Sequence, residues 1–70
     1  MQFTVETEWE TDGRWIAEVT ELPGAMQYGR TRSEAIARAE ALALRAIAER
    51  IEAGEQPVEP IHILLSEGQV

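Results

Sequence analysis

The chain contains no cysteine and no lysine, only four aromatic residues and no long hydrophobic run. Without cysteine there is no disulfide framework, and the one histidine cannot build a closed zinc site alone. No apolar stretch approaches the ~18 residues that span a membrane, so we expect no membrane association. The first residues lack the basic and apolar regions of a secretory signal. These absences favour a cytoplasmic protein that binds neither metal nor cofactor.

The length of 70 residues allows a single domain, spanning residues 1–70. A domain of this size buries only ~60% of the surface that its unfolded chain exposes. Small scaffolds without disulfides or metals commonly gain stability by oligomerisation. We therefore expect a homo-oligomer, either a dimer or a tetramer.

Acidic residues outnumber basic ones by thirteen to six, which gives a net charge of −7, and every basic residue is arginine. Negative charge repels phosphate backbones, so the composition argues against nucleic-acid binding. Within residues 1–29 the only basic residue is Arg14, whereas the acidic residues there are Glu6, Glu8, Glu10, Asp12, Glu18 and Glu21. This acidity either attracts a basic partner or merely keeps the protein soluble.

Alternating hydropathy predicts two half-buried strands, over residues 2–9 and 15–20, joined by a turn over residues 10–13. Gly13 supplies the positive φ that such a turn uses. The outward position of Ile16 marks a contact surface. The residues expected to face the core are Phe3, Val5, Thr7, Trp9, Trp15, Ala17 and Val19.

A corner at Leu22-Pro23-Gly24 ends the second strand, because proline cannot donate to the ladder. A third strand is predicted over residues 25–28, and Gly29 ends it. Short links between successive strands indicate an antiparallel meander. Met26 and Tyr28 share a face of this third strand, and we expect both to be buried.

A capping box at Thr31 and Glu34 predicts a helix over residues 32–53 that stops at Gly54. Leu44 lies off the inner stripe and is a candidate oligomer contact. Glu34 and Arg38 form an i,i+4 pair on the outer side. The inner stripe comprises Ala35, Ile36, Ala39, Leu42, Ala43, Ala46, Ile47 and Ile51.

An extended linker with two prolines, residues 55–60, leads to a final apolar strand over residues 61–65. After one helix this strand should run parallel to the third strand, and it pairs either within the subunit or with a neighbouring copy. The predicted fold class is therefore α+β. Its architecture is a two-layer βββαβ domain, in which an antiparallel three-stranded meander packs on one helix and a final strand follows.

No catalytic, cofactor-binding or metal-binding constellation can be assembled from these residues. Histidine side chains can act as general bases near neutral pH, but a single histidine among isoleucines, here His62, is typical of an outward-facing strand residue. Asp12 precedes glycine and is first a turn residue. An enzyme that uses Asp12, Glu18 or His62 is the least favoured interpretation, so we predict no catalytic activity.

Residues 3–52 resemble the HicB-like antitoxin family. The order and spacing of three short motifs, followed by an alanine-rich helix, carry the resemblance. The motifs are Asp12-Gly13-x-Trp15-x-Ala17, Glu21-Leu22-Pro23-Gly24-Ala25 and Gly29-x-Thr31-x-x-Glu34-Ala35.

The resemblance implies a βββαβ domain that oligomerises and docks onto a small, basic HicA-type ribonuclease toxin, whose active site it masks. Many members of the family continue into a C-terminal DNA-binding segment. This sequence has no room for one after residues 61–65, so no direct DNA binding is expected. The alternative is a stand-alone homo-oligomeric structural or regulatory protein with no toxin partner.

Overall fold

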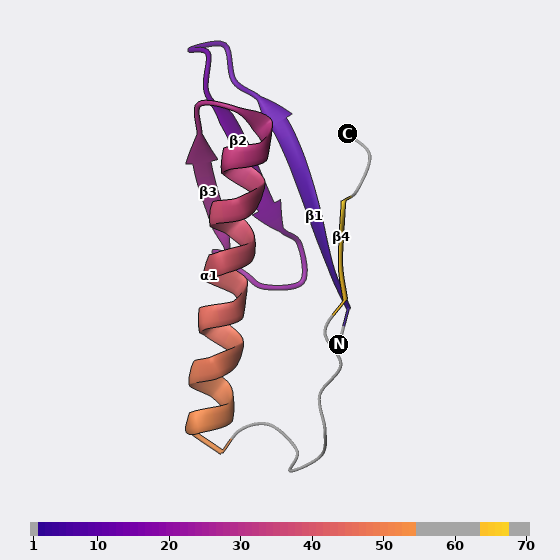
Figure 1. The fold of residues 1–70 in the computed structure, drawn as a ribbon, viewed down its shortest axis with the longest axis vertical. Helices are drawn as coiled ribbons and strands as arrows, with labels where there is room; N and C mark the ends of the chain where they lie inside the picture. Colours follow the sequence, from indigo (N-terminus) through magenta and orange to yellow (C-terminus); the bar gives the residue numbers. More distant parts are fainter. Residues whose placement is uncertain (1, 55–63, 68–70) are drawn as a thin grey trace.

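The computed structural model describes residues 2–54 and 64–67, which form a four-stranded sheet with one helix across one face (Figure 1). The elements are β1 Gln2–Trp9, β2 Trp15–Val19, β3 Met26–Gly29, α1 Arg32–Glu52 and β4 Leu64–Glu67. The strand order is β3-β2-β1-β4. Both β1–β2 and β2–β3 pair antiparallel, whereas β4 lies parallel to β1. The predicted α+β class and the antiparallel meander packed on one helix are confirmed.

Strand β4 pairs with β1 of the same chain, with Leu64 opposite Gln2 and Ser66 opposite Thr4. Because β1 and β3 both pair antiparallel with β2, β4 runs in the direction of β3, as expected. The strand extends to Glu67, two residues past the predicted end. Residues 55–63, which include His62 and the predicted linker, lie outside the described residues.

Two glycines with positive φ form the turns on either side of β2. Gly13 has φ 90° and donates its backbone N–H to the Glu10 carbonyl at 3.0 Å. Gly24 has φ 82° in the corner that the Ala25 N–H closes onto the Leu22 carbonyl at 3.0 Å. Because only glycine adopts these angles without strain, the sequence predicted both turns correctly.

The N-terminus of α1 is capped mainly as predicted. Thr31 Oγ1 accepts a hydrogen bond from the Glu34 N–H at 3.1 Å. The Glu34 carboxylate reaches back one residue further than the capping box predicts, and accepts from the N–H of Arg30 at 3.2 Å instead of that of Thr31. It also pairs with Arg38 at 3.2 Å, which confirms the expected i,i+4 pair.

The core lies between α1 and the sheet. Alanines on the inner side of α1 let the helix approach closely, and at Gly29 an added Cβ would lie 2.5 Å from the Ala35 nitrogen. The buried Thr7 hydroxyl accepts from Arg32 Nε at 3.1 Å, so its polar group is satisfied. The buried apolar side chains are Phe3, Val5, Ala17, Val19, Leu22, Ala25, Ala35, Ile36, Ala39, Ala43 and Ile47.

Four residues expected in the core are exposed. Ile51 is 47% exposed because the last turn of α1 extends beyond the sheet (Figure 1). Trp9 is 55% exposed at the end of β1, the strand of the meander that α1 covers least, although it lies opposite the half-buried Trp15 as predicted. Met26 and Tyr28 are exposed because their register places them on the sheet face that α1 does not cover.

Candidate functional site

The most distinctive surface is the sheet face opposite α1, which no other element of the described chain covers. We call it the open face and define it by the outward side chains of the meander. Two cross-strand rows form its centre. The first row is Glu6, Glu18 and Met26, and the second is Glu8, Ile16 and Tyr28.

The open face is strongly acidic. Glu6 lies directly opposite Glu18 in the ladder, and Glu8 lies in the next row. Within residues 2–54 and 64–67, no ion pair involves any of these three carboxylates. Like charges directly opposite each other destabilise an antiparallel pair. The fold therefore tolerates an arrangement that weakens its own sheet.

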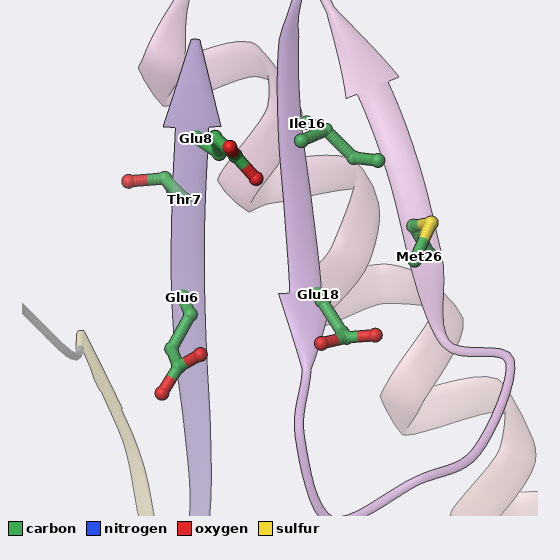
Figure 2. A pocket seen from close by; sticks show the side chains of 6 residues that line it. All are labelled: Glu6, Thr7, Glu8, Ile16, Glu18 and Met26. Atoms are coloured by element: carbon green, nitrogen blue, oxygen red, sulfur yellow. The ribbon is translucent and has the colours of Figure 1, made fainter. Parts of the chain in front are cut away.

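A shallow hollow of about 120 Å³ lies in the open face (Figure 2). Figure 2 shows Glu6 and Glu8 on β1, Ile16 and Glu18 on the neighbouring β2, and Met26 on β3, all lining this hollow. Ile16 is half-buried and Met26 is 43% exposed. The outward Ile16 and the acidity of residues 1–29 were the two sequence signals that pointed to this surface. The cross-strand rows themselves are set by register and not by composition.

One arginine lies at the corner of the open face. The Arg14 guanidinium stacks over the Tyr28 ring, with Cζ 4.2 Å from the ring centroid. Its Nε is 2.7 Å from Asp12 Oδ2, so its charge is already paired. The Arg14 backbone N–H donates to the Asp12 carboxylate, and this bond, with the guanidinium beside it, lowers the pKa of Asp12 below its ordinary value of 3.8. Arg14 therefore does not neutralise the three glutamates.

A further carboxylate, Glu21, stabilises the end of the β1–β2 ladder that lies away from the Gly13 turn. The Thr4 backbone N–H donates to Glu21 Oε1 at 2.7 Å, and the Thr20 N–H donates to the Thr4 carbonyl at 3.1 Å. The bond from Thr4 lowers the pKa of Glu21 below its ordinary value of 4.5. Glu21 therefore has a structural role at this end of the sheet.

The lowered pKa of Glu21 predicts an acid-sensitive fold. A carboxylate whose pKa is depressed in the folded state stabilises that state above its unfolded pKa, here about 4.5, and the benefit is lost as pH falls through the folded value. We expect Glu21→Gln to lower Tm at pH 7 and to have a smaller effect at pH 3, in paired thermal melts. An equal loss at both pH values would contradict this role.

The structure does not bring together Asp12 and Glu18, the two catalytic candidates that lie within the described residues. Asp12 lies in the β1–β2 turn and Glu18 near the opposite end of β2, so they do not face a common site. No group of three acidic or histidine side chains in residues 2–54 and 64–67 could hold a metal ion. Among the described residues, α1 is too polar to cross a bilayer and no other helix is present. What the open face offers is charge and apolar contact, which are the means of binding another macromolecule.

No family model matches this chain, and no curated protein or solved structure was found to match it.

Proposed function

We propose that this chain is an antitoxin-type protein-interaction module, which neutralises a small, basic HicA-type ribonuclease by covering its active site with the open face. The observation that carries the proposal is the cluster of three carboxylates, Glu6, Glu8 and Glu18, which form no ion pair within the described residues and line one hollow with apolar Ile16 and Met26. The sequence motifs of residues 12–35 support the same class of protein. The complex would form in the cytoplasm.

The chemistry of the open face suits such a target. A ribonuclease holds RNA phosphates with lysine and arginine side chains. Carboxylates on adjacent strands of the open face would compete with RNA phosphates for those cationic side chains. The electrostatic field of the carboxylates would also speed the association of the two proteins. The apolar centre at Ile16 and Met26 supplies contact area from which water is excluded. Binding should weaken as salt is raised, because exposed charges are screened.

A charge reversal at the centre of the open face tests the proposal. Glu18 is flanked by Glu6 and Met26 in its row, so Glu18→Arg places a cation against the cations of the target. We expect at least a tenfold loss of affinity for the HicA-type protein of the same genome, about 1.4 kcal/mol, measured by calorimetry. Inhibition of RNA cleavage should fall in parallel.

The matched control is Glu49→Arg, which changes the net charge equally but lies on the exposed side of α1. It should leave affinity within twofold of the original chain. Absence of binding by the original chain, or equal losses in the two variants, would contradict docking through the open face.

The second candidate is a stand-alone homo-oligomeric structural or regulatory protein without a toxin. Exposed Leu44 and Ile51 on α1 favour it, because apolar side chains on one helix suit contacts between copies. Purification of the tagged chain from its native cell separates the two candidates. A small basic protein in stoichiometric amount supports the antitoxin, whereas a discrete oligomer of the chain alone supports the second candidate.

A further inference from the structure

Helix α1 carries a second apolar stripe, on the side that faces away from the sheet. Its members are spaced by four, three, four and three residues, which is the 3.5-residue repeat of helices that pack along one another. Leu44 is 45% exposed and Ile51 is 47% exposed. We call this set the outer stripe, and it comprises Ala37, Ala41, Leu44, Ala48 and Ile51.

The outer stripe is separate from the core stripe. The buried residues of α1 include Ala39, Ala43 and Ile47, which face the sheet. No element of the described chain packs on the other side of the helix (Figure 1). A helix that covers one sheet needs one apolar side, so the outer stripe is surplus to the fold of the single chain.

We infer that a second copy of this chain covers the outer stripe, with the two α1 helices antiparallel about a two-fold axis. This arrangement pairs large side chains with small ones, Leu44 with the partner's Ala48 and Ile51 with the partner's Ala41. Facing positions of unequal size interdigitate and fill the space between helices. A parallel pair would instead stack alanine on alanine and leave gaps.

The charges beside the outer stripe fit the same arrangement. Arg45 lies beside its middle and Glu52 beside its end, both on one side of the helix, whereas Arg38 already pairs with Glu34 and donates to the Tyr28 carbonyl. In the antiparallel pair Glu52 lies on the same side as Arg45 of the other copy, and symmetry repeats the contact. The helix dipoles also oppose each other. The open face cannot replace this interface, because pairing it with itself would bring two sets of unpaired glutamates together.

The inference goes beyond the proposed function and does not depend on it. Pairing through α1 leaves both open faces pointing outward, so each copy remains free to bind a basic partner. The dimer can therefore be tested without any toxin.

Sedimentation equilibrium of the full chain and two matched variants tests the interface. We expect a concentration-dependent dimer that Leu44→Glu converts to monomer. Tyr28→Glu adds the same charge at a side chain of similar exposure, 40% against 45%, but on the sheet face opposite α1, beside Ile16 and the Arg14 guanidinium, and should leave the dimer intact. A monomer at all concentrations, or a dimer lost in Tyr28→Glu and kept in Leu44→Glu, would overturn the inference.

Charge exchange tests the flanking contacts. Arg45→Glu and Glu52→Arg should each weaken self-association at least tenfold, since each substitution puts like charges next to each other at both symmetry-related contacts. An equal mixture of the two variants should restore association as a heterodimer, because both contacts again join opposite charges. Failure of the mixture to associate more tightly than either variant would overturn the antiparallel arrangement.

Cysteine crosslinking can determine whether the two α1 helices run antiparallel or parallel, because the chain has no cysteine of its own. Ala41→Cys and Ile51→Cys should form a disulfide only when mixed. In the antiparallel pair, residue 41 of one copy faces residue 51 of the other. The two residues 41 are therefore ten residues apart along the helices, about 15 Å, as are the two residues 51, and this is too far for a disulfide. Crosslinking of either variant with itself would show a parallel pair and contradict the inference.

Discussion

Replacing Gly29 with alanine is expected to destabilise the protein by about 3 kcal/mol, the upper part of the range for overpacked sites. The added Cβ would lie 2.5 Å from the nitrogen and 2.9 Å from the Cα of Ala35. Both atoms belong to the backbone, so the clash cannot be relieved by rotating a side chain. The N-terminal turn of α1 would have to move away from β3, and Tm should fall by roughly 10–20 °C.

Gly24→Ala is the control for this prediction. Nothing lies within 4 Å of a Cβ at Gly24, so the only cost there comes from its φ of 82°. That cost is about 1 kcal/mol. Thermal and urea unfolding of the two variants should rank Gly29→Ala well below Gly24→Ala. The reverse order would mean that β3 and α1 are not in close contact.

Ile47→Ala is expected to cost about 3 kcal/mol, because it removes the largest of the fully buried side chains. Ile47 is only 2% exposed and fills the space between α1 and the sheet. A single core of this size seldom contributes more than ~3–5 kcal/mol of net stability. We therefore expect a substantial unfolded fraction at 25 °C, visible as lost helical circular dichroism.

The same substitution at Ile51 provides the comparison, since Ile51 is 47% exposed at the end of α1. Measured at a concentration where the chain is monomeric, Ile51→Ala should change stability by less than ~0.5 kcal/mol. Equal effects at the two positions would place Ile51 in the core, as the inner-stripe pattern first predicted.

Local chemistry made most of the fold predictable. The glycines at positions 13 and 24, the Thr31 cap and the alternation in β1 each allow few conformations, so they identify turns, a helix start and a strand. The wrong burial predictions at Met26 and Tyr28 concern which face of the sheet α1 covers. Met26 and Tyr28 alternate like core residues, but only the register of β3 with β2 and the placement of α1 decide that Gln27 faces the helix.

The candidate site was predictable only in outline. Counting charges revealed an acidic N-terminal half, and Ile16 suggested a contact surface. The direct opposition of Glu6 and Glu18 depends on the length of the β1–β2 turn, since a shift of one residue would move either side chain to the other face. The sequence likewise did not decide which strand pairs with β4, because a strand that follows a helix can join either edge of the sheet.

The pairing of β1 with both β2 and β4 sets an order of events during synthesis on the ribosome. Strand β1 can pair with β2 as soon as residues 15–19 have emerged after the turn at Gly13. Its other edge remains unsatisfied until residues 64–67 have been added, some sixty residues after Phe3 and Thr4. The growing chain thus exposes an open β-edge until β4 has been made, and closing so long a loop is slow. The charged side chains at Glu6 and Glu8 protect that edge meanwhile, because charge opposes pairing with neighbouring nascent chains.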